Sequence, residues 1–290
     1  MRKQFKDTLL KLAKKDKRII LLFGDISVYL FREFQEKYPK QFYNIGICEN
    51  TIISAAAGLS SQGYIPFVHT IAPFITDRSF EQIKLDLCYN DFPANIVTIG
   101  STFDYAWDGP SHHTLSDIEM LRTLPNMEIV VPGSSQEADI LIKERYSSNN
   151  TTYFRLSDNP HNYEINKISF NQATIIKNNK SKLTIMTNGP LLDNVYEACK
   201  NYDVNLVYFN TIKPIDIKKL KQFADTKILV ISESYGLYEA ITQVNGLYAD
   251  LYGVKDFFYN SYGNIEDVRN KIGLDIKSIK KIIKKKLNKI

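Results

Sequence analysis

Short apolar runs alternate with helical patterns through the first half of the chain. Residues 18–23 form a nearly continuous apolar run, which is typical of a strand buried on both faces of a parallel sheet. This alternation predicts β-α-β units and therefore a doubly wound α/β domain. The other strand-like runs are 64–70, 95–100, 128–132 and 153–156, with helical patterns such as 80–89 and 136–146 between them.

Polar residues interrupt this pattern between about 157 and 182, which predicts a linker. A second α/β set then follows. Its strand-like runs are 183–186, 205–209, 227–231 and 256–259, and its helical patterns lie near 191–200, 216–223 and 236–251. We therefore predict an α/β fold with two doubly wound domains, residues 1–165 and 181–290, joined by a linker at 166–180.

The net charge of +5 would suit a nucleic-acid or membrane partner, but it comes from one segment. Residues 277–290 hold seven lysines and no acids, and subtracting seven from +5 leaves the rest of the chain at −2. Apolar residues recur there at helical spacing, at Ile279, Ile282, Ile283 and Leu287, and no aromatic residue lies between the lysines. The segment predicts a terminal amphipathic helix with a solvated basic face, and we expect neither nucleic acid nor membrane as a partner.

The composition is that of a folded protein in a reducing compartment. Apolar residues make up 44% of the chain, enough for a real core, and no apolar run approaches the roughly 18 residues of a membrane-spanning helix. Residues 1–6 are charged and lack the apolar stretch of a signal peptide. The three cysteines are odd in number and lack metal-ligand spacing, so we expect a cytoplasmic protein with no metal ligands of its own.

Glu49 lies between a strand-like run and a nearly all-apolar helical pattern that ends at Gly63. A carboxyl group at the start of a buried helix loses hydration, which raises its pKa because desolvation disfavours the charged form. Such a group can share a proton with a ring nitrogen. On this segment alone, an ordinary N-terminal glutamate stabilised by the helix dipole is the commoner explanation.

A second candidate segment, residues 108–114, contains an Asp-Gly-Pro turn and two histidines. The turn presents Asp108, His112 and His113 from a loop near the end of the strand-like run that closes at Gly100. In open α/β sheets ligands collect at the carboxyl ends of the strands, and a histidine there titrates near neutrality. On pattern alone, this group suits acid–base chemistry and a solvated loop about equally.

Together these segments resemble the transketolase family. Residues 46–50 with the Ala-rich pattern that follows, Asp-Gly-Pro-Ser-His at 108–112 and Leu-Arg-Thr-Leu-Pro-Asn at 121–126 are similar to the family's pyrimidine-binding domain. Residues 211–216 and 231–236 are similar to its C-terminal domain. The resemblance covers nearly the whole chain, and its motifs are specific in combination. It implies a pyrimidine-binding domain followed by a transketolase C-terminal-like domain.

The resemblance implies thiamine diphosphate as cofactor, which becomes reactive when its C2 loses a proton. Glu49 matches the glutamate that hydrogen-bonds N1′ of the aminopyrimidine and so activates the cofactor. Phe74 matches the aromatic residue that stacks on this ring, although its type would also suit a core position. Asp25 matches an acid near the thiazolium.

The resemblance also implies the residues that contact substrate. Asp108 and His112 match residues that hold substrate hydroxyls, and His112 is expected to take part in catalysis. Arg155 matches an arginine that holds a sugar phosphate, where a guanidinium fork suits the oxyanion; its type alone would also suit a surface ion pair. His113 stands where the family often has Gln and is expected to contact substrate as well.

Three departures from the family pattern bear on substrate and partner. Gly100 stands where sugar-phosphate transketolases have a phosphate-binding His, and Trp107 stands where an acid commonly precedes Asp-Gly-Pro, so we expect a substrate other than the usual pentose phosphates. The chain also has no Gly-Asp-Gly with a later Asn-Asn, the diphosphate and Mg²⁺ motif of the family's N-terminal domain. The resemblance therefore implies the C-terminal subunit of a split enzyme, in an α2β2 heterotetramer with an N-terminal subunit that holds Mg²⁺.

The expected reaction is transfer of a two-carbon ketol unit between a ketose and an aldose, in specialised sugar biosynthesis. Three alternatives are a subunit of a deoxyxylulose-phosphate synthase-like enzyme, the β subunit of a 2-oxoacid dehydrogenase and a non-catalytic regulatory paralogue. The spacing of Glu49 and the Asp-Gly-Pro-Ser-His segment disfavours the dehydrogenase, and the retained Glu49, Phe74, Asp108 and His112 disfavour the paralogue. The donor and acceptor sugars stay open.

Overall fold

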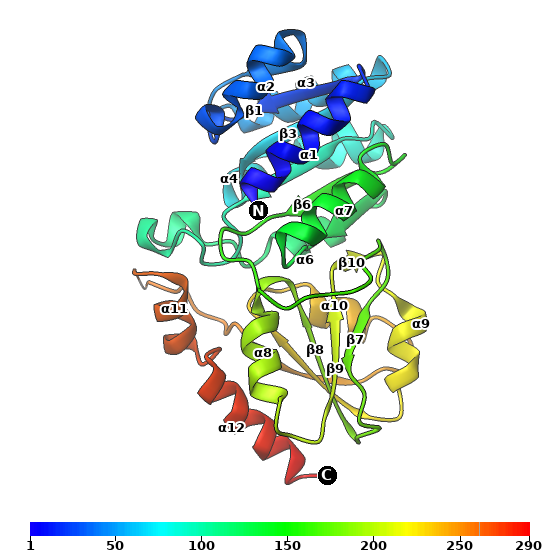
Figure 1. The fold of residues 1–290 in the computed structure, drawn as a ribbon, viewed down its shortest axis with the longest axis vertical. Coiled ribbons are helices and arrows are strands. Elements are labelled where there is room, and N and C mark those ends of the chain that lie inside the picture. Colours follow the sequence, from blue (N-terminus) through cyan, green and yellow to red (C-terminus); the bar gives the residue numbers. More distant parts are fainter. Residues whose placement is uncertain (261) are drawn as a thin grey trace.

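The computed structural model describes residues 1–260 and 262–290, and it shows two β-sheets flanked by helices (Figure 1). Strands of the first sheet are parallel except for β10, which pairs antiparallel with β5. This sheet has seven strands, which in spatial order are β10 (Thr211–Lys213), β5 (Met127–Val130), β6 (Thr151–Arg155), β4 (Asn95–Ile99), β3 (Ile65–Ile71), β1 (Ile19–Phe23) and β2 (Phe42–Asn44).

Helices cover both faces of the first sheet, so the prediction of a doubly wound α/β arrangement is confirmed. Apolar side chains of α1, α2 and α7 pack on one face, and those of α3, α6 and the π-helical segment η3 pack on the other. These elements are α1 (Arg2–Lys15), α2 (Arg32–Lys37), α3 (Glu49–Ser61), η3 (Ile83–Tyr89), α6 (Asp117–Arg122) and α7 (Ser135–Arg145), with the short helices α4 (Ala72–Arg78) and α5 (Phe80–Gln82) between β3 and η3.

The second sheet has five strands, which in spatial order are β12 (Ala249–Gly253), β11 (Lys227–Ser232), β8 (Leu183–Asn188), β9 (Asn205–Phe209) and β7 (Thr174–Lys177). Its strands are parallel except for β7, which pairs antiparallel with β9. Its helices are α8 (Leu192–Cys199), α9 (Ile217–Leu220), α10 (Leu237–Thr242), α11 (Ile265–Ile272) and α12 (Ile276–Leu287). Helix α12 is the predicted amphipathic tail, and it packs on α8 with Ile279 and Ile283 fully buried.

Three sequence-based assignments differ from the structure. The segment predicted as a linker contains β7, a half-buried edge strand whose few apolar residues produce no clear pattern. The strand predicted at 256–259 lies instead at β12, and the helix predicted at 236–251 ends at Thr242. Strand β10 follows β9 in the chain yet joins the first sheet, so the chain crosses between the sheets a second time after the predicted linker.

Candidate active site

The candidate residues follow four adjacent strands of the first sheet. Strands β4, β3, β1 and β2 are neighbours, and parallel strands place their carboxyl ends at one edge. Asp25 follows β1, Glu49 follows β2 and Phe74 follows β3. The loop at 100–116 follows β4 and carries Asp108, His112 and His113. The fold therefore places these six residues at the same sheet edge.

Glu49 is the first residue of α3 and is only 3% exposed. The guanidinium of Arg78, at the end of α4, lies beside its carboxylate, with Nη1 3.4 Å from each carboxylate oxygen. The free N–H groups of the first turn of α3 add positive potential at the same place. A carboxylate is thus held at the mouth of a buried helix, with its outward side covered by a cation.

An aromatic group adjoins this carboxylate. The Phe74 ring packs edge-on against the imidazole of His112, with the ring centres 4.9 Å apart, and the guanidinium carbon of Arg78 lies 4.3 Å from the centre of the Phe74 ring. Tyr105 contacts both His112 and Trp107, at 6.3 and 5.3 Å between ring centres. A continuous chain of contacts therefore runs from Glu49 to Trp107, through Arg78, Phe74, His112 and Tyr105. Phe74 is partly exposed and is therefore not a core residue.

The remaining predicted residues differ in exposure. Asp25 is exposed, and its carboxylate accepts a hydrogen bond of 2.9 Å from Nδ2 of Asn44. Asp108 is exposed in the turn before Gly109. The ring of His113 packs edge-on against Phe103 at 5.0 Å, and burial, followed by the nearby charge of His112, lowers the pKa of His113. Both effects favour the neutral form of the His113 ring.

Arg155 is the residue whose position differs most from expectation. It is 2% exposed, and its Nε donates to Asp117 at 2.6 Å. Its other two nitrogens donate to Oγ1 of Thr102 at 3.1 Å and to the carbonyl of Thr114 at 2.6 Å. Burial alone would lower the pKa of Arg155, but nearby acidic groups, chiefly the Asp117 carboxylate, more than offset this effect and raise it. In this structure all three guanidinium nitrogens of Arg155 bond other groups of the protein, and the expectation that Arg155 holds a substrate phosphate stays a prediction.

Arg155 anchors the loop at 100–116. Thr102 and Thr114 form an isolated antiparallel bridge that closes the loop at 100–116, and one guanidinium bonds both of them. Gly100 begins this loop with φ near +84°, and a Cβ there would lie 2.7 Å from the ring of Tyr105. A side chain at Gly100 would therefore be strained and would displace Tyr105, which explains locally why no histidine stands here.

A buried histidine supports the loop that carries Asp25. His69 in β3 is fully buried, with Nδ1 2.7 Å from the carbonyl of Val97 and Nε2 3.1 Å from Oγ of Ser27. Ser27 and Asp25 both have positive φ, so this loop depends on such contacts for its shape. Burial lowers the pKa of His69 to about 4, and the bond to Val97 opposes the shift.

We expect His69 to make the fold less stable in mild acid. The unfolded chain protonates this histidine below about pH 6.5, whereas the folded chain does so only below about pH 4, so the unfolded state binds more protons in this window and stability falls as the pH drops. By pH 5 the loss should reach about 2 kcal/mol. Urea unfolding at pH 7.5 and pH 5 should show this loss in the wild type but not in His69→Phe. An equal loss in both proteins would contradict the assignment.

Arg78 and Asp117 are site residues that the sequence analysis did not single out. Arg78 stands four positions after Phe74, a spacing that places both side chains on one face of a helix, so a helical reading of residues 72–78 would have indicated the contact. Asp117 had no comparable signal, because it acts through a residue 38 positions away in the sequence.

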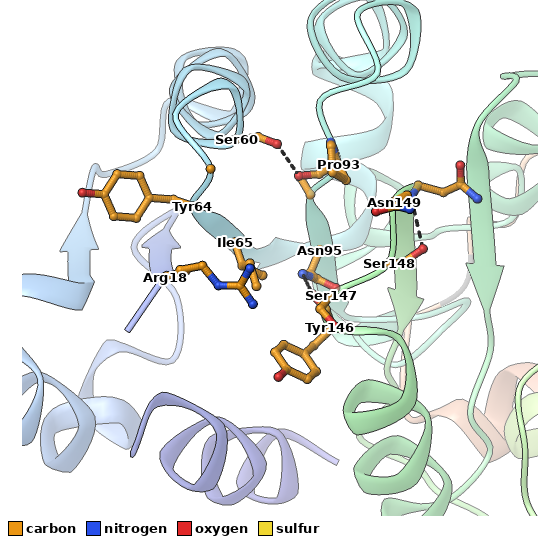
Figure 2. Close-up of a pocket in the computed structure, with 13 residues that line it drawn as sticks. Arg18, Ser60, Tyr64, Ile65, Pro93, Asn95, Tyr146, Ser147, Ser148 and Asn149 are labelled. Carbon is orange, nitrogen blue, oxygen red and sulfur yellow. Dashed lines mark hydrogen bonds between the residues drawn. The ribbon is translucent and has the colours of Figure 1, made fainter. Parts of the chain in front are cut away.

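A separate polar hollow lies at the opposite edge of the sheet. It has a volume of about 170 Å³ and is lined by residues just before or at the start of β1, β3, β4 and β6, among them Arg18, Tyr64, Asn95 and Asn149 (Figure 2). These residues are at the amino ends of the strands. The hollow therefore does not belong to the candidate site.

Within residues 1–260 and 262–290, no cluster of histidine, cysteine or acidic side chains could hold a metal ion. No helix in the same part of the chain is long and apolar enough to cross a membrane.

Comparison with known proteins identifies the family. The family described as "Transketolase, pyrimidine binding domain" matches residues 1–160, more than half of the chain. The chain belongs to the transketolase family. One subunit of the apulose-4-phosphate transketolase of Phocaeicola vulgatus is 32% identical over 245 residues, which cover 80% of this chain and 78% of that protein. The putative transketolase C-terminal section of Methanocaldococcus jannaschii is 28% identical over 307 residues, covering 100% of this chain and 96% of that protein.

The solved structures agree with this transketolase assignment. A structure described as "Split gene transketolase, inactive beta4 tetramer" is 25% identical and superposes with a TM-score of 0.86, covering 98% of this chain and 97% of that one. The 1-deoxy-D-xylulose-5-phosphate synthase of Lawsonia intracellularis matches at 27% identity, but this chain spans only 47% of its length. The relatives therefore match the C-terminal part of a split transketolase better than the synthase alternative.

Proposed function

We propose that this chain is the C-terminal subunit of a split, thiamine-diphosphate-dependent transketolase that transfers a two-carbon ketol unit between a ketose and an aldose. One observation carries the proposal: a buried carboxylate, an aromatic ring and a histidine meet at one sheet edge, on a chain that matches a split-gene transketolase over 98% of its length. The Asp-Gly-Pro-Ser-His loop supplies that histidine.

The residues present fit the aminopyrimidine end of the cofactor. Glu49 offers a buried carboxylate for the ring nitrogen N1′, and Phe74 offers a partly exposed aromatic face beside it. The guanidinium of Arg78, which covers both groups, is planar and carries N–H donors, as the aminopyrimidine edge does. Glu49 and Phe74 therefore already hold a group of similar chemistry. Asp25 lies at the same edge and is proposed to face the thiazolium.

When bound, thiamine diphosphate supplies a carbon nucleophile after its C2 loses a proton. Glu49 holds or releases a proton at N1′, and its burial strengthens this interaction because little water screens it. His112 and Asp108 bind substrate hydroxyls from the loop at 100–116, and His113 contributes a second imidazole. Arg155 acts on substrate only indirectly, since it fixes both ends of this loop.

The proposed partner is an N-terminal transketolase subunit that carries the diphosphate and Mg²⁺ site, assembled with this chain as an α2β2 heterotetramer. Two relatives support this proposal, one named as a subunit of an apulose-4-phosphate transketolase and one described as an inactive β4 tetramer of a split-gene transketolase. The three cysteines are free, with Cys88 and Cys199 buried, which supports a reducing cytoplasm as the place of action.

We expect tight cofactor binding only in the presence of the partner subunit. The isolated chain offers the groups that face the pyrimidine, whereas its sequence has no Gly-Asp-Gly with a later Asn-Asn, the family's motif for the charged diphosphate and Mg²⁺. Titration calorimetry with thiamine diphosphate and Mg²⁺ should show weak binding to the chain alone and tight binding to the reconstituted complex. Tight binding and turnover by the isolated chain would rule out the split-enzyme proposal. The same complex, assayed on a panel of ketoses, identifies the donor.

At the two positions where the family binds a substrate phosphate, this chain presents no exposed cation. Gly100 has no side chain, and Arg155 is buried with its donors in use. Trp107, in the loop at 100–116, is 56% exposed and offers a flat apolar face instead. These observations support a substrate other than the usual pentose phosphates.

A further inference from the structure

Arg78 contacts both Glu49 and Phe74, the two groups that a pyrimidine ring would need. Its Nη1 lies 3.4 Å from each oxygen of Glu49, and its guanidinium carbon lies 4.3 Å from the centre of the Phe74 ring. Phe74 and Arg78 share one helix at a spacing of four residues, so the guanidinium reaches over the ring and on to the carboxylate of α3. One flat cation is thus stacked on the aromatic face and hydrogen-bonded to the acid at the same time.

These contacts cannot coexist with a ring that stacks on the same face of Phe74 and bonds the same carboxylate. We infer that Arg78 is a stand-in for the aminopyrimidine: it covers Glu49 and Phe74 in the cofactor-free chain and moves aside when the cofactor binds. The inference rests on the proposed function for the identity of the ring that displaces it. Arg78 thus covers the empty site and takes no part in the chemistry, whereas Glu49 has the proposed catalytic role.

The surroundings allow the side chain of Arg78 to move while its backbone stays in place. The Arg78 side chain is 50% exposed, against 4% for that of Glu49. The carbonyl of Arg78 accepts a hydrogen bond of 2.9 Å from Nδ2 of Asn50, and the same amide donates to Gln82 at 2.8 Å. The helix end is therefore tied to α3, and rotation of the side chain alone would clear the site.

A stand-in is physically useful because an uncompensated buried carboxylate is costly. Removing one partner of a buried ion pair destabilises a protein strongly, since the remaining charge keeps its desolvation penalty. With Arg78 present, Glu49 is compensated in the empty chain. The incoming ring must then break one partly exposed ion pair and one cation–π contact.

The test compares Arg78→Met with the wild type in the complex reconstituted with the N-terminal subunit. Methionine retains the apolar stem and removes the competing cation. Loss of a partly exposed ion pair and a cation–π contact should tighten the dissociation constant of thiamine diphosphate about three- to thirty-fold at fixed Mg²⁺, measured by calorimetry. Arg78→Lys, which keeps the charge but not the flat stacking group, should fall between the two. Arg18→Met, which removes a partly exposed pair with Asp16 at the other sheet edge, should not change binding.

A second measurement needs no cofactor. In the isolated chain, a double-mutant cycle of Arg78→Met and Glu49→Gln on thermal unfolding should show a coupling, because each change removes the same contact. Unchanged or weaker cofactor binding in Arg78→Met, or an additive cycle, would overturn the stand-in role. A wild-type complex that does not bind thiamine diphosphate at all would overturn the proposed function and, with it, the identity of the displacing ring; the cycle would still decide whether Arg78 compensates Glu49.

Discussion

Replacing Glu49 with Gln should lower the turnover of the reconstituted enzyme at least about 100-fold, the lower range for a positioned acid–base group. Glutamine retains the shape of the side chain at the start of α3, but it cannot take or release a proton at N1′ of the cofactor. Because Glu49 is 3% exposed, water does not readily replace it in this role. Exchange of the C2 proton of the cofactor, followed by NMR in deuterated buffer, should slow in parallel with turnover.

A matched control separates proton transfer from a general change of charge. Glu81 is an exposed carboxylate in the neighbouring short helix α5, and Glu81→Gln removes the same charge near the same sheet edge. We expect Glu81→Gln to keep both rates. Near-normal C2 exchange in Glu49→Gln would mean that another group activates the cofactor.

Replacing Asp117 with Asn should lower the free energy of unfolding by about 3–5 kcal/mol. The change leaves the guanidinium of Arg155 buried without its carboxylate, where the side-chain exposures of the two residues are 2% and 0%. The hydroxyl of Tyr153 also loses its charged acceptor, to which it donates at 2.7 Å. Urea unfolding measures the loss. The exposed pair of Lys200 and Glu197 provides the control, and Glu197→Gln should cost no more than about 1 kcal/mol.

Arg155→Lys distinguishes this structural role from the phosphate contact expected from the family. Lysine keeps the charge but cannot bond Asp117, Thr102 and Thr114 at once. We expect a loss of stability and a similar loss of kcat/KM for phosphorylated and unphosphorylated ketoses. A loss confined to KM for phosphorylated substrates, in a protein of normal stability, would restore the phosphate role.

Much of the site was predictable because its signals are local. The Asp-Gly-Pro turn, the strand that ends at Gly24 and the start of the Ala-rich helix each depend on a few consecutive residues. Parallel strands then bring their carboxyl ends to one edge, so a correct α/β assignment alone gathers Asp25, Glu49 and Phe74. The spacing of motifs could not indicate which of these residues are exposed or what else contacts them.

The fold was predictable to a similar degree. Continuous apolar runs identified most strands of both sheets, because a strand buried on both faces carries few polar residues. Strands at the margins were missed: β7 is a half-buried edge, β10 is short, and no residue of β12 is fully buried. Such strands are held by pairing with a neighbour, and their own residues carry little signal.

The sequence by itself determined the buried strands, the turns and the helix starts of this protein, because hydrophobic burial and backbone preferences act on residues close together in the chain. Only the tertiary structure decided the roles of its arginines. An arginine binds whichever acid the fold brings within reach: Arg78 reaches Glu49 across 29 positions, and Arg155 reaches Asp117 across 38. As a result, Arg78 is a partly exposed residue that covers Glu49, and Arg155 is a buried residue that anchors the loop at 100–116.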